Sequence, residues 1–169
     1  MNPVLDAWNN ASESEAVEAM MACCGARRWA NQMVALRPLA GRPALSEAAD
    51  RTWATMGEPD WLEAFACHPR IGERKATPAP ERSTAWSEQE QSGTKSATRN
   101  ILRELAEGNE LYEQRFGFTY IVCATGRSAD ELLDILKCRL ANDRMAELKE
   151  AAEQQRQIMQ IRIGKWLLS

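Results

Sequence analysis

The chain has 169 residues, of which 44% are hydrophobic and 27% charged, and its 21 basic and 24 acidic residues leave a formal net charge of -3. A chain of this length can bury roughly 70% of its unfolded surface, so we expect a single domain over residues 1–169. The charges are mixed without a basic block, which argues against nucleic acid as a partner. No apolar run approaches the ~20 residues that cross a bilayer, and residues 1–8 lack a signal-peptide pattern, so we expect a cytoplasmic protein with no membrane association.

Helix-forming residues dominate the chain, and start signals followed by apolar residues at helical spacing predict an all-α fold. In the first part of the chain the signals are a capping box formed by Ser12 and Glu15, a serine cap at Ser46, and Pro59 in a first helical turn. The helices expected there begin after Ser12 and cover residues 27–36, 46–56 and 59–66.

A polar stretch broken by prolines covers residues 74–86 and predicts a mobile loop or lid. The only aromatic and β-branched run, residues 116–124, is expected to be extended and buried, and too solitary to form a sheet. The remaining helices are expected over residues 87–107, 109–115, 129–140 and 142–168, with Gly108 as a break and Ser128 with Glu131 as a capping box. The expected architecture is a bundle of about eight or nine helices with one short extended buried segment.

The only histidine, His68, lies in the run Ala-Cys-His-Pro-Arg-Ile-Gly over residues 66–72. Histidine has an unperturbed pKa near neutrality, so this residue is the first candidate for proton transfer. Pro69 disfavours helix for the residue before it, which predicts an extended His68 just past a helix end, and Gly72 permits a tight turn. The alternatives are that His68 caps the preceding helix, or that Cys67 and His68 form a nucleophile pair, which adjacent residues rarely do.

A second polar cluster, Ser-Glu-Gln-Glu-Gln-Ser-Gly, occupies residues 87–93. If a helix begins at Ser87, then Ser87, Glu90 and Gln91 gather at its N-terminus, where unpaired backbone amides favour a carboxylate ligand. The alternative is a capping box of Ser87 and Glu90 that needs no function. The other carboxylates are scattered along the chain and are interpreted as solvated charge.

Arg162 lies on an apolar face of the expected final helix, with Ile158 and Met159 one turn before it and Trp166 one turn after it. A buried guanidinium without a partner is costly. Arg162 is therefore expected either to extend its charge outward to water or to meet a carboxylate inside.

The five cysteines are odd in number and include the adjacent pair Cys23-Cys24, which predicts reduced thiols. They lack Cys-x-x-Cys spacing, and a single histidine offers no His-x-x-x-His pair, so no metal site is predicted.

Four separated motifs occur in one order along nearly the whole chain, and together they resemble the 2-oxo-4-hydroxy-4-carboxy-5-ureidoimidazoline (OHCU) decarboxylases of urate degradation. Two positions depart from the family pattern, where Thr94 and Ile163 replace leucine, and the second makes Arg156 the fallback for Arg162. The motifs are His68-Pro69-Arg70-Ile71-Gly72, Ser87-x-x-Glu90-Gln91-x-Gly93, Tyr112-x-x-x-Phe116-Gly117-Phe118 and Arg139-Leu140-x-Asn142.

This resemblance implies an all-helical, homodimeric enzyme that converts OHCU to (S)-allantoin with release of carbon dioxide, with no cofactor and no metal. By position, the implied catalytic residues are His68, Glu90 and Arg162. The implied substrate-binding residues are Pro69, Ser87, Gln91, Ile121, Val122 and Cys123.

Two other function classes fit the same residues. In a non-catalytic helical interaction domain, His68 would only end a helix, and the six tryptophans and an amphipathic final helix would serve partner docking. A hydrolase of a related ureide ring would use the same acid–base pair but add water instead of losing carbon dioxide.

Overall fold

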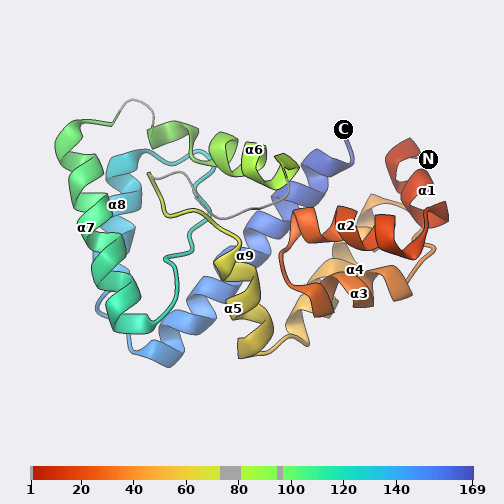
Figure 1. Ribbon diagram of the computed structural model, residues 1–169, viewed down its shortest axis with the longest axis horizontal. Helices are drawn as coiled ribbons and strands as arrows, with labels where there is room; N and C mark the ends of the chain where they lie inside the picture. Colours follow the sequence, from red (N-terminus) through yellow and green to blue (C-terminus); the bar gives the residue numbers. More distant parts are fainter. Residues whose placement is uncertain (1, 73–80, 95–96) are drawn as a thin grey trace. The chain divides into compact units, whose positions relative to one another are not determined.

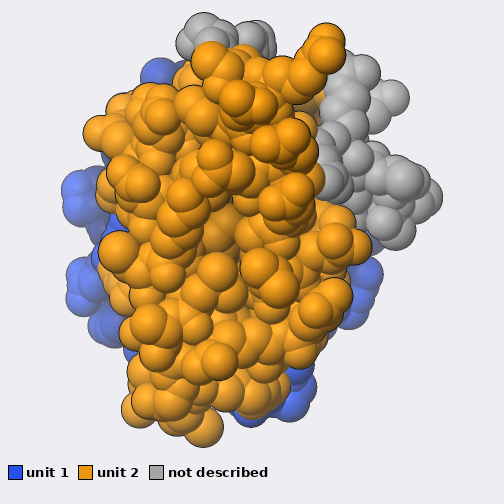
Figure 2. Space-filling model, turned by 90° about the vertical axis from the view of Figure 1, so that its left-hand side faces the viewer, with its two compact units in different colours: residues 1–64, 156–169 blue, residues 65–155 orange. Residues whose placement is uncertain are grey.

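The computed structural model describes residues 2–72, 81–94 and 97–169. That part of the chain contains nine α-helices, one 3-10 turn and no β-strand (Figure 1), which confirms the all-α prediction. The chain divides into two compact units, residues 1–64 with 156–169 and residues 65–155 (Figure 2). That residues 1–169 act as one domain therefore stays a prediction.

The first unit, residues 1–64 with 156–169, has a core of large apolar side chains. Trp29 is fully buried, and its indole Nε1–H donates to the Ala49 carbonyl at 3.2 Å. The ring of Trp8 contacts that of Trp166 edge-on, with 6.0 Å between centroids. The helices are α1 (Pro3–Asn10), α2 (Glu13–Cys23), α3 (Arg27–Ala35), α4 (Arg42–Ala54), most of α5 (Glu58–Ala66) and the end of α9 (Arg144–Trp166).

Start signals in the first unit were predicted with mixed success. The capping box is confirmed, because the Ser12 side chain accepts the Glu15 N–H and the Glu15 carboxylate accepts the Ser12 N–H. Helix α5 begins at Glu58 with Pro59 in its first turn, as expected. The expected start at Ser46 is wrong: α4 begins at Arg42, because a proline in the first turn, Pro43, has its φ preset for a helix.

The second unit, residues 65–155, is built around two neighbouring helices, α7 (Arg99–Phe116) and α8 (Ala129–Arg139), which lie side by side (Figure 1). The expected break at Gly108 is wrong, since α7 passes through it. A Cβ at Gly108 would lie 2.6 Å from Leu136 Cδ2, so the glycine allows the close approach of α8. Ser128 and Glu131 form the expected capping box of α8.

The helix expected from Ser87 to Glu107 is also wrong. Helix α6 (Glu81–Glu90) begins earlier, Ser87 lies in its last turn, and a 3-10 turn (Ser92–Thr94) separates it from α7, which Thr98 caps. The expected loop over residues 74–86 is thus helical from Glu81, and its residues 74–80 lie outside the described part.

The buried face of α6 is polar, which explains why apolar periodicity gave no signal there. Ser83, Ser87 and Glu90 follow one another at helical spacing and are only 3%, 4% and 6% exposed. Helix α6 therefore presents serine and carboxylate groups to the protein interior.

The extended segment and the final helix complete the second unit. The buried non-helical segment is confirmed, since residues 119–124 have no helix or strand and residues 120–124 are buried. Its expected start at residue 116 is wrong, because Phe116 is the last residue of α7. The final helix α9 begins at Arg144, slightly later than expected, because the Asp143 carboxylate accepts the Ala146 N–H at 2.9 Å. In the part of the chain that the structure describes, no helix is long and apolar enough to cross a membrane.

Candidate active site

His68 lies just beyond the end of α5, as the sequence predicts. Its backbone N–H donates to the Phe65 carbonyl at 3.1 Å, while its ring Nε2 lies 2.7 Å from Oε1 of Gln155. Gln155 is fully buried in α9. The imidazole is therefore directed to another helix rather than back onto the end of its own.

Side chains of α7 hold the turn that follows His68. The Arg70 guanidinium makes two parallel hydrogen bonds to the Glu113 carboxylate, at 2.9 and 2.7 Å. One turn earlier on α7, the Asn109 amide donates to the Ile71 carbonyl at 3.1 Å. A bidentate ion pair and a buried backbone bond fix the direction of the chain immediately after the histidine.

The same turn is connected to the end of α6. Gly72 has a φ of 84°, a left-handed conformation that favours glycine, and its N–H donates to Oε1 of Gln91 at 2.9 Å. Because Glu90 directly precedes Gln91, this bond links the histidine turn to the helix that carries the buried carboxylate.

The predicted reason for grouping Ser87, Glu90 and Gln91 is wrong, although the residues remain candidates. They lie at the C-terminal end of α6, so they cannot use unpaired amides at a helix N-terminus to attract an anion. Their polar side chains, rather than a helix terminus, are what α6 contributes.

Gly93, next to this cluster, permits a close backbone approach. A Cβ there would lie 2.1 Å from the carbonyl oxygen of Arg127, a contact that no side chain tolerates. The glycine of the second motif therefore allows the 3-10 turn after α6 to pack directly on the backbone before α8.

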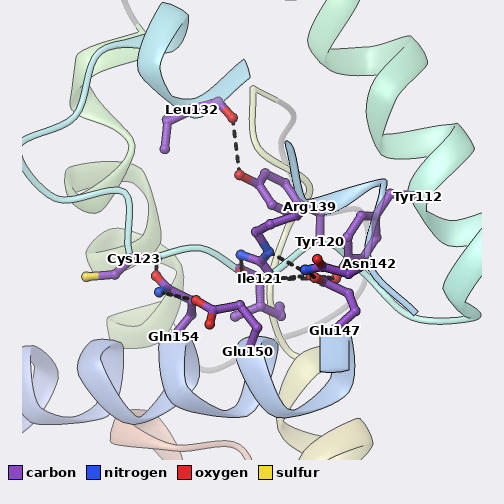
Figure 3. A network of polar contacts seen from close by, with 10 residues as sticks. All are labelled: Tyr112, Tyr120, Ile121, Cys123, Leu132, Arg139, Asn142, Glu147, Glu150 and Gln154. Carbon is purple, nitrogen blue, oxygen red and sulfur yellow. Dashed lines mark hydrogen bonds and ion pairs between the residues drawn. The ribbon is translucent and has the colours of Figure 1, made fainter. Parts of the chain in front are cut away.

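The extended segment is held at its backbone by two helices (Figure 3). The Arg139 guanidinium donates from Nη1 to the Ile121 carbonyl at 2.6 Å, and Oε1 of Gln154 accepts the Cys123 N–H at 2.9 Å. The Arg127 side chain donates to the Cys123 carbonyl at 3.2 Å. Val122, by contrast, makes no hydrogen bond to any described residue.

A buried carboxylate, Glu147, is the centre of the polar network in Figure 3. The Tyr112 hydroxyl and the Arg139 guanidinium donate to Oε1, with 2.7 Å from Arg139 Nε, and the Asn142 amide donates to Oε2 at 2.9 Å. Glu147 is fully buried and Arg139 is 6% exposed. The third and fourth motifs thus meet in one ion-pair network, and Glu147 corrects the interpretation that the remaining carboxylates are solvated.

Burial and pairing in and beside this network shift the pKa values of two tyrosines and one arginine. Burial chiefly raises the pKa of the Tyr112 and Tyr120 hydroxyls above their ordinary value of 10.0, so both stay neutral. Burial lowers the pKa of Arg139, but its hydrogen bond and ion pair with Glu147 outweigh burial and leave that pKa raised. A guanidinium paired with a carboxylate is the stable arrangement here.

The two candidate arginines of α9 differ in their surroundings within the first unit. Arg162 is 2% exposed, so it does not extend outward to water. Arg156 is half-buried, and its Nη1 lies 3.1 and 3.2 Å from the two carboxylate oxygens of Asp50. The fallback Arg156 thus forms an ion pair, and the role of Arg162 toward a substrate stays a prediction.

The structure brings His68, Pro69, Ser87, Glu90, Gln91 and the segment 121–123 into the second unit, whereas Arg162 belongs to the first. No three histidine, cysteine or acidic side chains of residues 2–72, 81–94 and 97–169 converge as metal ligands. The sequence missed Gln154, Gln155 and Glu147, and only the nearby Arg-Leu-x-Asn motif gave a signal for the last of them.

The fold and these buried polar groups define an all-helical protein with a histidine turn joined to a helix that carries serine and glutamate. The family model for OHCU decarboxylase matches residues 9–164, and the chain belongs to this family.

Individual relatives agree with the family assignment. The chain is 38% identical over 147 residues to the uric acid degradation bifunctional protein TTL of Arabidopsis thaliana, covering 85% of this chain and 44% of the relative. It is 29% identical to the OHCU decarboxylase of Amia calva, covering 57% of this chain and 55% of that one. The chain therefore spans about half, or less, of the length of these relatives.

Solved structures give the same result for the fold. A crystal structure of OHCU decarboxylase in the presence of (S)-allantoin matches with a TM-score of 0.77 and 34% identity, covering 90% of this chain and 99% of that one. A crystal structure of (S)-allantoin synthase matches with a TM-score of 0.71 at 16% identity, covering 96% of this chain and 53% of that one, which supports the fold alone.

Proposed function

We propose that this chain catalyses the decarboxylation of OHCU to (S)-allantoin with release of carbon dioxide, without a cofactor. The observation that carries the proposal is the family match over residues 9–164, and the likeness to an OHCU decarboxylase over 99% of that chain supports it.

The substrate supplies its own electron sink. OHCU carries its carboxylate and a hydroxyl on one ring carbon, next to a carbon–nitrogen double bond that accepts the electrons left when carbon dioxide departs. A cofactor that stabilises a carbanion is therefore not needed. The protein has to orient the ring, take the hydroxyl proton, and deliver a proton to one face of the neighbouring carbon.

Acid–base work is assigned to two residues of the second unit. His68 takes the hydroxyl proton, and Glu90 acts as its acid–base partner or fixes the protonation state of the ring. Arg162 offsets the negative charge of the substrate. Either His68 or Glu90 delivers the proton that sets the stereochemistry.

The hydrogen bonds of Gln91 and of the extended segment indicate which of their groups can bind the substrate. Oε1 of Gln91 accepts the Gly72 N–H, so the Nε2 end of this side chain is the donor for a substrate carbonyl. The Cys123 N–H and carbonyl are both engaged by protein groups, which makes Val122 the residue of this segment whose backbone amide and carbonyl can meet the substrate. Pro69, Ser87 and Ile121 complete the proposed wall.

Freshly generated OHCU followed by circular dichroism tests the proposal. Spontaneous decay should give racemic allantoin, so the protein is expected to accelerate appearance of the (S) enantiomer, with one carbon dioxide released per turnover. Heat-denatured protein is the control. A product that has gained water would indicate a ureide hydrolase instead. No acceleration of either reaction would favour the non-catalytic interaction domain.

Family membership also leads us to propose a cytoplasmic homodimer with no nucleic-acid partner, folded as one domain across both units. Light scattering during size-exclusion chromatography measures whether the protein is a dimer. If both units fold as one domain, calorimetry is expected to show a single cooperative unfolding transition.

A further inference from the structure

Asn109 of α7 holds the turn that follows His68 from inside the protein. Its Nδ2–H donates to the Ile71 carbonyl at 3.1 Å, and the residue is fully buried. The Arg70–Glu113 pair, which holds the same turn, has side chains that are 34% and 30% exposed. Water therefore competes with the ion pair, whereas the bond from Asn109 is shielded from water.

The oxygen of the same amide is unpaired. Oδ1 of Asn109 is buried and accepts no hydrogen bond from any residue that the structure describes. A flip of the amide would place this oxygen against the Ile71 carbonyl oxygen, so the turn requires the orientation with Nδ2 toward Ile71. A buried acceptor without a donor is unfavourable and rare in folded proteins. The favourable polar contact of this side chain is therefore the N–H bond to the turn.

We propose that Asn109 is a positioning residue whose Nδ2–H fixes the Ile71 carbonyl and thereby the turn that presents His68. The hold on the turn stands on the geometry, while its effect on catalysis rests on the proposed function. Ile71 follows His68 by three residues, and Pro69 between them has a fixed φ, so a displacement of the Ile71 peptide is passed on to the histidine. A displacement of about 1 Å in a catalytic group can slow a reaction about a hundredfold.

Removing the amide should affect the turn more than the stability of the fold. Leucine has the same branching as asparagine, so Asn109→Leu removes Nδ2 and Oδ1 together without leaving a cavity. The unpaired acceptor Oδ1 disappears, and within the described part of the chain the Ile71 carbonyl becomes unpaired in its place. The number of unpaired acceptors is unchanged, so the unfolding midpoint should shift little. The carbonyl can regain a hydrogen bond by turning toward water, which moves the turn.

Nuclear magnetic resonance of the His68 ring reports on its surroundings without substrate, because this residue is the only histidine of the chain. The wild type is expected to show one ring Cε1–H signal, and Asn109→Leu should move that signal or split it into several. With OHCU, the kcat of Asn109→Leu should fall about ten- to hundredfold with a smaller change in KM. An unmoved signal, or an unchanged kcat, would overturn the proposal.

Asn109→Ala separates the loss of the donor from the loss of packing. It also lacks the N–H but leaves a cavity, so it should unfold at a lower temperature than Asn109→Leu. At a temperature where both variants are folded, their kcat values should fall to a similar extent, because both have lost the same donor. A kcat that follows the unfolding midpoint, with a wild-type value in Asn109→Leu, would make Asn109 a packing residue and overturn the proposal.

Tyr112→Phe is the matched control on the same helix. Tyr112 is fully buried like Asn109, but its hydroxyl bonds to Glu147 and Arg139 instead of to the turn. This variant should lower the unfolding midpoint and leave the His68 signal and kcat unchanged. Equal changes of signal and kcat in Tyr112→Phe and Asn109→Leu would show a general loosening of the unit and would overturn the proposal.

Hydrogen exchange of the Asn109 side chain tests the bond in the wild type, even if neither variant folds. The Nδ2 proton that faces Ile71 is expected to exchange slowly with water, and exchange as fast as that of an exposed amide would overturn the proposal. The spectra and the exchange need no substrate. A wild type that does not act on OHCU would refute the proposed function and the catalytic role, whereas a moved His68 signal in Asn109→Leu would still support the hold on the turn.

Discussion

Two regions of the second unit are built from family motifs and differ in how their polar groups are used. Around Glu147, both carboxylate oxygens and all three guanidinium nitrogens of Arg139 are bonded to protein groups, and the pair is buried. At the histidine turn, His68 and Gln91 are only half-buried, and the hydrogen bond of Gln91 to the Gly72 N–H uses its Oε1 alone. The second region is the more exposed one and holds the residues that the proposed function assigns to the substrate, so the first is interpreted as scaffold and the second as site.

Loss of Arg139 should be the most destructive change. Arg139→Leu leaves the Glu147 carboxylate buried without its cation, which is expected to cost about 3–5 kcal/mol of unfolding free energy, a large part of the stability of a domain. Denaturant unfolding measures it. The double variant with Glu147→Leu should recover part of the loss, and a double variant as unstable as the single one would contradict the scaffold role.

Removing the Tyr112 hydroxyl should have a smaller effect. Tyr112→Phe deletes one hydrogen bond to a carboxylate that keeps Arg139 and Asn142, which is expected to cost about 1.5–3 kcal/mol. Activity at a temperature where the variant is folded should match the wild type. A large fall in kcat with little loss of stability would assign the network to the site instead.

Gly93→Ala examines the close contact between the 3-10 turn that follows α6 and the backbone before α8. The added methyl would meet the Arg127 carbonyl, so the backbone must shift at an expected cost of about 1–3 kcal/mol. Gly57→Ala is the control, because its Cβ would meet only Pro59 Cδ at 3.8 Å. Equal unfolding midpoints for the two variants would show that the contact is not strained.

High pH should weaken the scaffold gradually. The folded-state pKa values of Tyr112 and Tyr120 are raised above 10.0, so their contribution to stability is complete below about pH 10 and is lost as pH rises toward the folded-state values. Each tyrosine contributes up to about 1.4 kcal/mol per pH unit in that range. Tyr112→Phe should make the unfolding free energy fall less steeply with pH, and the remaining slope should come from Tyr120. An unchanged slope in Tyr112→Phe would contradict this.

The capping-box pattern predicted a helix start correctly only where the capping serine is exposed. Ser12 and Ser128 cap helices as expected, because a capping box depends on residues three apart. The same pattern at Ser87 failed, since serine and glutamate three apart also share one face inside a helix, and in α6 that face is buried.

The candidate site residues come from the sequence, whereas the contacts that hold them depend on residues far away along the chain. His68 stood out because it is unique and precedes a proline. Gln155 lies 87 positions away and Glu147 is 35 from Tyr112, so no spacing in the sequence reveals either contact. Only packing of α9 against the rest of the second unit makes them partners.

The most direct test of the central claim is the rate of (S)-allantoin formation from fresh OHCU by His68→Gln, measured beside Tyr112→Phe under conditions where both are folded. The account predicts that His68→Gln loses at least about a hundredfold in kcat with an unchanged unfolding midpoint, because glutamine cannot accept the proton. Wild-type kcat in His68→Gln would contradict it.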